Sequence, residues 1–365
     1  MILQSVKSTE VTVGEMVSIL SNAYCSLINK DIPLEKFPSV MLWGPPGVGK
    51  SQGVRQVAAQ IQQATGKIVE VTDVRLLLFN PVDLRGIPTA NADKTLAVWL
   101  KPKIFQLDES SEKINILLLD EISAAPPSVQ AAAYQITLDR TIGEHKLPEN
   151  CIVIAAGNRT NDKSVAYKMP KALANRLCHL DVYSNADSWK EWALKSNIHE
   201  KVIGFIEYKP EMLSDFDAKE ESNSFATARS WEMVSNILNV ISDKIEDNYP
   251  LIAGCVGEKA AKEFKNWDEI YTNVPAPELI FKGEHKIVPQ MPAILFALSS
   301  GIVAYARKNQ DKNGIDNAIA YVNRFPVEFK NKIFSDFLRI REIRRILEDN
   351  DIFCEWVSMF YKGWM

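Results

Sequence analysis

The chain has 365 residues, of which 46% are hydrophobic and 24% are charged, and its formal net charge is −4. These values are typical of a globular protein of two or three domains with a full core, and they argue against nucleic-acid binding through bulk basic charge. No apolar run approaches the roughly 18 residues that a membrane-spanning helix needs. Residues 1–10 lack a basic region followed by an apolar one, so we expect no secretory signal and a cytoplasmic protein.

The cysteines and histidines do not suggest a metal site or a disulfide framework. The five cysteines are scattered without a Cys-x-x-Cys pair, and the four histidines do not cluster. We interpret the cysteines as small buried residues in a reducing compartment, and we expect no zinc.

Residues 12–29 place apolar side chains at helical spacing, which predicts an amphipathic helix before the first core strand. Residues 40–43 are an apolar run typical of a buried parallel strand. A Gly/Pro turn follows, and a helix is expected to begin at Lys50 and Ser51.

The turn fits the pattern G-x-x-x-x-G-K-[ST] at each fixed position. Its glycines let backbone N–H groups converge on phosphate oxygens, and the helix N-terminus adds partial positive charge. Lys50 adds a full charge, and the Ser51 hydroxyl can hold Mg²⁺. A chance glycine-rich loop is the alternative, but the flanking strand and helix favour a nucleoside triphosphate site. The predicted nucleotide contacts are Gly44, Pro45, Pro46, Gly47, Val48, Gly49, Lys50, Ser51 and Gln52. Residues 9–13 are a further candidate for contacts with the base.

The region after the expected helix 51–64 and strand 67–72 departs from simple α/β alternation. Residues 73–100 include a stretch, 80–88, that is rich in turn-forming residues and carries Leu84 and Ile87. Such a loop either contacts a partner or folds back onto its own domain.

Residues 114–120 are a continuous apolar run that ends in Asp120, and Glu121 follows. Full burial on both faces is typical of a central parallel strand, whose carboxyl end is where ligands bind in open α/β sheets. Asp120 is placed to hold Mg²⁺ through water, and Glu121 to orient and deprotonate an attacking water. A surface strand end is the alternative for this pattern taken alone.

A helix over 128–139, a hairpin over 140–148 and a buried strand over 151–156 follow. The strand ends in Gly157 and Asn158, whose amide would reach the γ-phosphate and the attacking water. A plain Gly-Asn turn is the alternative. Residues 171–176 lead into another expected strand, 178–182.

Helical patterns take over from residue 189. Thr227 is a suitable N-cap, and Arg229 in the following first turn opposes the helix dipole, which suggests an anionic partner or an ordinary salt bridge. Later helices are expected over 291–308, 314–322 and 326–347. The apolar stripe from Ile352 to Trp364 is core or a docking surface, and the basic residues near 339–345 indicate a charged helix face more than a nucleic-acid stripe.

Several segments together resemble AAA+ ATPases, and within them the MoxR-like branch. The resemblance covers about residues 10–300. It is carried by Trp43-Gly-Pro-Pro-Gly-Val-Gly-Lys-Ser51, Asp83-Leu-Arg-Gly-Ile-Pro88, Leu119-Asp-Glu-Ile-Ser-Ala-Ala-Pro-Pro127, Val153-Ile-Ala-Ala-Gly-Asn-Arg159, Ala172-Leu-Ala-Asn-Arg-Leu177 and Ala253-Gly-Cys-Val-Gly-Glu-Lys-Ala-Ala261.

The resemblance implies residue roles. Lys50 and Ser51 would be Walker A, Asp120 and Glu121 Walker B, Asn158 sensor 1 and Arg229 sensor 2. The trans-acting arginine finger would be Arg176, with Arg159 as the competitor. Ala228 stands where relatives often carry proline.

The implied architecture is an AAA+ P-loop core with a central parallel sheet (1–185), an α-helical lid (186–272) and a helical C-terminal extension (273–365). An insertion near 73–100 and a hairpin near 140–148 would project towards a pore or a partner. The implied function is Mg²⁺-dependent ATP hydrolysis in a ring, expected to be a hexamer, that remodels or matures a protein client. A partner with a von Willebrand factor A-type (VWA) domain would act in trans, and ATP, ADP and Mg²⁺ would be the cofactors. A nucleic-acid-dependent motor or loader, and a nucleotide-gated scaffold with little turnover, are the alternatives.

Overall fold

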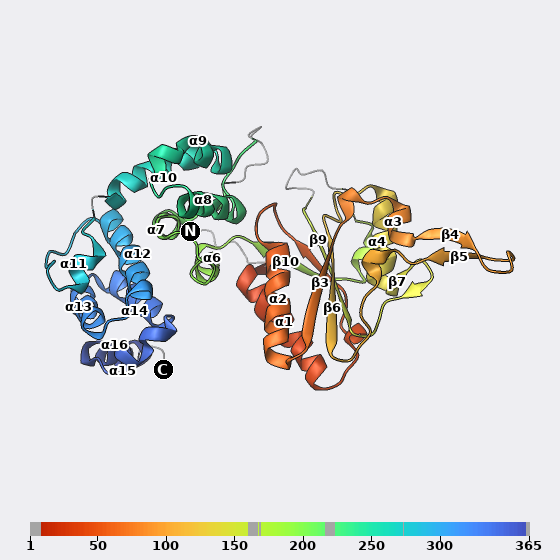
Figure 1. Ribbon diagram of the computed structural model, residues 1–365, viewed down its shortest axis with the longest axis horizontal. Coiled ribbons are helices and arrows are strands. Elements are labelled where there is room, and N and C mark those ends of the chain that lie inside the picture. The colour runs from red at the N-terminus through yellow and green to blue at the C-terminus, as the bar shows by residue number, and fades with distance from the viewer. Residues whose placement is uncertain (1–8, 160–166, 168, 216–222, 273, 363–365) are drawn as a thin grey trace. The chain divides into compact units, whose positions relative to one another are not determined.

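The computed structural model describes residues 9–159, 167, 169–215, 223–272 and 274–362 (Figure 1). The chain divides into two compact units. The first takes the described residues up to Trp189 together with Thr227–Arg229, and the second takes the rest. Within the described residues, no helix is both long enough and apolar enough to cross a bilayer.

The first unit is built on a six-stranded parallel sheet with the order β1-β10-β2-β9-β6-β3. Its strands are β1 (Glu10–Thr12), β2 (Val40–Trp43), β3 (Ile68–Arg75), β6 (Lys113–Asp120), β9 (Cys151–Gly157) and β10 (Cys178–Tyr183). Each predicted core strand is present, and the predicted parallel α/β core is confirmed.

The register of this sheet brings the predicted functional residues to one edge. Trp43 at the end of β2 pairs with Gly157 at the end of β9, and Leu119 of β6 pairs with Ala155. The residues that follow these strand ends therefore leave the sheet side by side, at the carboxyl edge where ligands bind in this fold class.

Helices cover both faces of the sheet (Figure 1). The helix α1 and the helix α2 bury their apolar sides against one face, and α4 packs on the other. The helical segments of this unit are α1 (Val13–Asn29), η1 (Leu34–Lys36), α2 (Lys50–Thr65), η2 (Leu76–Leu78), α3 (Pro81–Arg85), η3 (Lys103–Phe105), α4 (Pro127–Asp139) and α5 (Lys171–Ala174). Thr12 begins α1 through a capping box with Glu15, which explains the sharp change from edge strand to helix.

Two small antiparallel hairpins interrupt the α/β alternation. The strand β4 (Ile87–Ala90) pairs with β5 (Ala97–Leu100), and β7 (Thr141–Ile142) pairs with β8 (His145–Lys146). Figure 1 shows the β4–β5 hairpin extending away from the sheet. The first hairpin lies in the segment 73–100, after the end of β3, η2 and α3, and the second lies in the segment 140–148.

The second unit is helical. Its elements are α6 (Ala186–Ala193, which begins in the first unit), α7 (Glu200–Tyr208), η5 (Pro210–Leu213), α8 (Ala228–Val240), α9 (Ile245–Val256), α10 (Glu258–Thr272), α11 (Pro277–Phe281), α12 (Pro292–Lys308), α13 (Lys312–Val322), α14 (Val327–Leu338), η6 (Arg341–Ile343), α15 (Arg344–Glu348) and α16 (Asp351–Lys362). The subdivision of this region into a lid (186–272) and an extension (273–365) stays a prediction.

The single helix predicted over 326–347 is wrong. The helix α14 ends at Leu338, Ile340 takes an extended backbone, and a short 3-10 turn precedes α15. Ile340 and Ile343 are both buried in the core of this unit, and the break allows both side chains to face inward.

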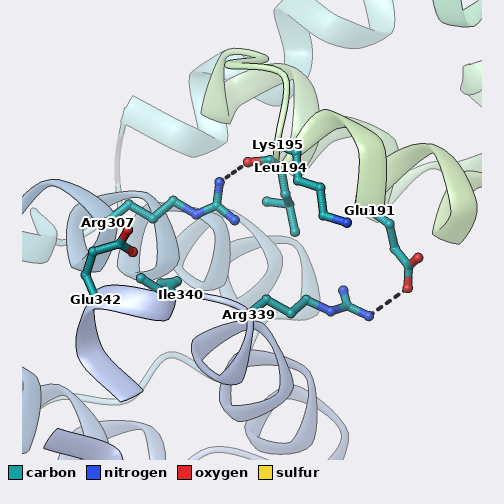
Figure 2. A pocket seen from close by; sticks show the side chains of 7 residues that line it. All are labelled: Glu191, Leu194, Lys195, Arg307, Arg339, Ile340 and Glu342. Atoms are coloured by element: carbon teal, nitrogen blue, oxygen red, sulfur yellow. Dashed lines mark hydrogen bonds and ion pairs between the residues drawn. The ribbon is translucent and has the colours of Figure 1, made fainter. Parts of the chain in front are cut away.

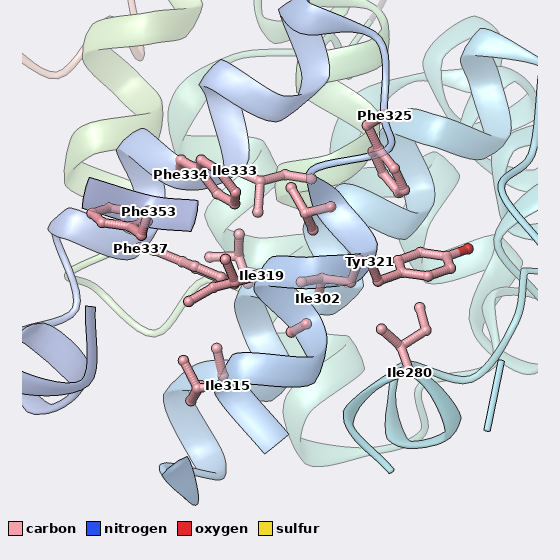
Figure 3. Packing of buried hydrophobic residues seen from close by; sticks show 14 of the residues in the cluster. Ile280, Ile302, Ile315, Ile319, Tyr321, Phe325, Ile333, Phe334, Phe337 and Phe353 are labelled. Carbon is pink, nitrogen blue, oxygen red and sulfur yellow. The ribbon is translucent and has the colours of Figure 1, made fainter. Parts of the chain in front are cut away.

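The C-terminal apolar stripe belongs to the core for the residues whose side chains are described. Phe353 and Trp356 are buried, and the ring centroid of Phe353 lies 5.2 Å from that of Phe334 (Figure 3). The predicted member Trp364 lies outside the described residues.

Candidate nucleotide site

The loop between β2 and α2 has the backbone that a phosphate-binding loop requires. Gly47 and Gly49 adopt φ values of 74° and 106°, a region that favours glycine. At Gly44 an added Cβ would lie 2.4 Å from the carbonyl oxygen of Val182, so only glycine fits beside β10. Val48 is buried in the core and fixes the middle of the loop. The first N–H groups of α2 have no intrahelical acceptor, and they point where phosphate oxygens would bind.

Lys50 is buried, and its ammonium group lies within the loop. Its Nζ donates to the carbonyl oxygen of Gly44 at 2.6 Å, to that of Pro45 at 3.1 Å and to Oδ1 of Asn158 at 3.1 Å. The structure thus brings together the predicted Walker A lysine and the predicted sensor 1 amide, which come from different strand ends.

The predicted metal ligands also meet. The Ser51 hydroxyl donates a 2.5 Å hydrogen bond to Oδ2 of Asp120. Mg²⁺ sites in nucleotide enzymes use one or two protein oxygens together with phosphate oxygens and water. The pair of oxygens from Ser51 and Asp120 fits that donor set.

Glu121 follows directly and is exposed. Its φ of 58° lies in the left-handed region, and its N–H donates to Oδ1 of Asp120 at 2.8 Å. The predicted roles of Asp120 in metal binding and of Glu121 in water activation stay predictions.

Ser123 is a residue that the sequence interpretation missed. It is buried, and its Oγ accepts a 2.9 Å hydrogen bond from the backbone N–H of Asn158. An added Cβ on Gly157 would come within 2.8 Å of the same oxygen. Ser123 therefore sets the position of Asn158, and its only sequence signal is its place two residues after Glu121.

The two candidate finger arginines differ sharply. Arg159 forms an ion pair with Asp181, with its Nη2 2.6 Å and its Nε 3.0 Å from Oδ1. The Thr9 hydroxyl also donates to Asp181, at 2.9 Å. The predicted contact of residues 9–13 with the base stays a prediction. Arg176 is exposed and makes no hydrogen bond or ion pair to the described part of the chain.

Arg229, the predicted sensor 2 residue, is exposed in the first turn of α8. It forms no ion pair with any residue that the structure describes. Thr227, two residues earlier, is buried, and its Cβ lies 2.8 Å from where a Cβ on Gly47 would be. Thr227, which belongs to the first unit, therefore packs against the phosphate-binding loop.

Each of the two interpretations of residues 80–88, a loop folded onto its own domain and a loop that contacts a partner, fits one of the two apolar side chains. Leu84 is buried in the core, whereas Ile87 is 61% exposed. Leu96 and Leu100 of the same hairpin are 67% and 57% exposed. The two hairpins touch where the His145 ring nitrogen Nε2 lies 2.9 Å from the carbonyl oxygen of Trp99.

A surface pocket of about 300 Å³ lies within the second unit (Figure 2). Charges of both signs line it, and Arg339 pairs there with Glu191 at 2.9 Å. Arg307 donates to the carbonyl oxygen of Leu194. No predicted functional residue lines this pocket.

The remaining reactive side chains form no second centre in the described residues. No group of three or more His, Cys, Asp or Glu there is arranged to hold a metal ion by itself. All five cysteines are free, and burial raises the pKa of the Cys151 thiol to about 12, which keeps it protonated.

Residues 39–179 match the model of the ATPase family associated with various cellular activities (AAA). The match falls on the unit that holds the phosphate-binding loop, the Ser51–Asp120 pair and Asn158. This segment of the chain is therefore similar to AAA-type ATPase domains. ATP hydrolysis is its activity, and ATP or ADP with Mg²⁺ is its cofactor. No curated protein matches the chain.

Solved structures align with the chain at low identity. A proposed ATPase of Cytophaga hutchinsonii is 16% identical, with 88% of this chain and 81% of that chain covered and a TM-score of 0.33. A mutant form of RuvB from Thermotoga maritima is 14% identical, with coverages of 79% and 82% and a TM-score of 0.35. Brucella abortus NtrX in complex with ADP is 13% identical, with coverages of 84% and 66% and a TM-score of 0.38. At these values the alignments say nothing of function.

Proposed function

We propose that this chain is a MoxR-like AAA+ ATPase of the cytoplasm that assembles into a ring, expected to be a hexamer, and uses ATP hydrolysis to remodel or mature a protein client. The MoxR-like assignment rests on the sequence motifs, and so does a VWA-domain partner in trans. The ring and the protein client have support in the arrangement of side chains.

The residues of the site divide the chemistry between them. Lys50 and the N–H groups at the start of α2 would bind the phosphates. Ser51 and Asp120 would hold Mg²⁺, which would supply charge stabilisation at the phosphoryl oxygens. Glu121 takes a proton from the attacking water, and Asn158 orients that water. Ser123 keeps the Asn158 backbone in place for this task.

The exposure of Arg176, without an ion pair to the described residues, is the observation that best supports a ring. A finger that acts on a neighbouring subunit must be exposed and not already neutralised, and Arg176 meets both conditions. Arg159 does not, because Asp181 holds its guanidinium. An arginine supplied in trans contributes about 10³–10⁵ in rate in GTPase systems. Arg229, exposed at the start of α8, would contact the nucleotide of its own subunit as sensor 2.

The β4–β5 hairpin favours a protein client over nucleic acid. Its exposed side chains include Ile87, Leu96 and Leu100, and its tip carries one Asp and one Lys. A surface that tracks a phosphate backbone needs clustered Lys and Arg instead. Exposed apolar side chains on a projecting hairpin are typical of a surface that contacts protein.

The test is the solution mass of the Glu121→Gln variant by light scattering, with and without ATP and Mg²⁺. This variant keeps the nucleotide contacts but lacks the base, so it should bind ATP, stop turnover and hold the assembled state. We expect a mass near six subunits with nucleotide. The Lys50→Ala variant serves as the control that should not respond to ATP.

A monomer under both conditions would contradict the ring and the trans finger together. Stimulation of hydrolysis by DNA, with no effect of unfolded protein, would favour the motor or loader instead. The trapped ring also provides the bait for a client, and replacement of Leu96 by Asp should weaken client capture without changing the mass.

A further inference from the structure

The turn between α5 and β10 presents Arg176. The N–H of Leu177 donates to the carbonyl oxygen of Ala174 at 3.2 Å, which closes a four-residue turn with Arg176 in its third position. Leu177 is buried and Arg176 is exposed. The direction of the Arg176 side chain therefore depends on how firmly this turn is held.

A histidine from the next strand holds the same carbonyl group. The ring nitrogen Nε2 of His179 lies 2.7 Å from the carbonyl oxygen of Ala174. The other ring nitrogen, Nδ1, lies 2.8 Å from Nε1 of Trp43, and the two rings stack at an interplanar angle of 9°. An indole N–H can only donate, so Nδ1 of His179 must accept and Nε2 must carry the hydrogen. Trp43 thus fixes the tautomer that lets His179 donate to Ala174.

Trp43 also belongs to the nucleotide site. It is the last residue of β2 and directly precedes Gly44, whose carbonyl oxygen accepts a hydrogen bond from the ammonium of Lys50. A short series of contacts therefore joins the phosphate-binding loop of a subunit to the turn that carries its own Arg176.

We propose that His179 is the positioning residue for Arg176, and that Trp43 fixes the tautomer with which His179 holds the turn that the subunit offers to its neighbour. This inference rests on the proposed role of Arg176 as the trans finger. His179 touches no nucleotide and acts only through the backbone of the turn.

The primary test is His179→Phe, which keeps a ring beside Trp43 and removes both hydrogen bonds. Displacement of a catalytic group by about 1 Å costs on the order of 10²-fold in rate, so we expect kcat for ATP to fall about 10- to 100-fold. The dissociation constant for ADP with Mg²⁺ should change by less than about twofold, since ground-state binding is untouched. His179→Gln, whose amide can still donate to Ala174, should recover part of kcat, and Trp43→Phe should lie between the wild type and His179→Phe.

The matched control is His285→Phe. The ring of His285 also contacts a backbone carbonyl, that of Ile287 at 2.9 Å, and an aromatic ring, that of Tyr321 at a centroid distance of 5.9 Å. It lies in the second unit and has no part in the proposed chemistry, so its kcat should equal that of the wild type.

The double variant His179→Phe/Arg176→Ala decides whether His179 acts through Arg176. We expect its kcat to be no lower than that of Arg176→Ala alone, because the guanidinium that His179 would position is already absent. The inference would be overturned if kcat of the double variant fell below that of Arg176→Ala by the same factor that separates His179→Phe from the wild type. Weaker ADP binding in His179→Phe would also overturn it, and either result would assign the contacts to general stability.

The two proposals fail separately. Normal turnover of Arg176→Ala would remove the finger, and the inference with it. Slow turnover of Arg176→Ala beside wild-type turnover of His179→Phe would leave the finger in place and refute the role of His179. If His179→Phe does not fold, Trp43→Phe and His179→Gln carry the same comparison, and wild-type kcat in Trp43→Phe refutes the fixed tautomer.

Discussion

The hydroxyl of Ser51 and the carboxylate of Asp120 lie 2.5 Å apart, although 69 positions separate them in the chain. One begins a helix and the other ends a strand, and the parallel sheet brings both to its carboxyl edge. Two oxygens that are held together in this way can bind a small, rigid cation with little reorganisation.

Replacement of Asp120 by Asn should therefore abolish the dependence of nucleotide binding on Mg²⁺. The neutral amide keeps the size of the side chain but removes the charge that attracts the cation. We expect turnover to fall at least about 100-fold, and ADP affinity to become the same with Mg²⁺ and with EDTA. Calorimetric titration of ADP in both buffers measures this. A persistent gain of affinity from Mg²⁺ would show that the cation is held elsewhere.

Lys50→Ala should weaken nucleotide binding strongly. A buried charge-assisted contact of this kind is worth about 1.5–3 kcal/mol, which corresponds to roughly a 10- to 150-fold loss of ADP affinity. Lys113 provides the matched control. It is also a lysine of this unit, but its ion pairs with Glu70 and Asp108 lie at the surface, so Lys113→Ala should bind ADP as the wild type does.

Ser123→Ala should slow hydrolysis without weakening nucleotide binding. It removes the acceptor that fixes the backbone of Asn158, so we expect kcat to fall about tenfold while ADP affinity is kept. Ser39 is also buried, and its hydroxyl donates to the carbonyl oxygen of Thr137 at 2.6 Å. Ser39→Ala should lose a similar free energy of unfolding, about 1 kcal/mol, but keep kcat. Equal kcat values in the two variants would contradict the role of Ser123.

Replacement of Arg159 should lower the stability of the protein, whereas replacement of Arg176 should lower its turnover. Arg159→Ala breaks a partly exposed ion pair worth up to about 1 kcal/mol, so its melting temperature should fall by a few degrees. Arg176→Ala should melt like the wild type and lose most of its turnover. The opposite pattern, with turnover lost only in Arg159→Ala, would transfer the finger to Arg159.

Lys190 should stabilise the helical unit up to strongly alkaline pH. Its side chain is 11% exposed, and its Nζ pairs with Glu207 and, at 2.6 Å, with Asp336. Burial alone would lower the pKa of Lys190, but the two carboxylates outweigh it and raise that pKa above the usual lysine value. A raised folded-state pKa means that the stabilisation is complete below the unfolded pKa, near 10.4, and is lost as the pH rises through the folded value.

The measurement is urea unfolding of the wild type and of Lys190→Met. Loss of the cation leaves Glu207 to pair with Lys332 at 3.0 Å, and Asp336 with the partly exposed Arg339 at 3.3 Å. The free energy of unfolding should therefore fall by up to about 3–5 kcal/mol at pH 8. The difference between the two proteins should stay constant from about pH 8 to 10 and narrow above that. A difference that widens with alkaline pH would contradict the raised pKa.

Much of the first unit could be predicted because its signals are local. The apolar runs of β2, β6 and β9, and the glycines of the phosphate-binding loop, each follow from burial or backbone geometry within a few residues. The parallel sheet then places their ends together, so Lys50, Asp120 and Asn158 could be grouped before any distance was known.

The contacts that could not be predicted depend on side chains that the sequence leaves unspecified. Ser123 and His179 contact backbone groups of Asn158 and Ala174, and such contacts have no residue pattern. The break after α14 arises because Ile340 and Ile343 pack into one core, which is a tertiary effect that overrides helix propensity.

The edge strand β1 has a practical consequence for preparing the protein. Residues 10–12 pair with β10 through Asp181, Val182 and Tyr183 and so cover one side of the sheet. A chain shortened to begin at residue 13 would leave the backbone of β10 open along this side. Open strand edges recruit other strands, so such a shortened protein should accumulate in inclusion bodies.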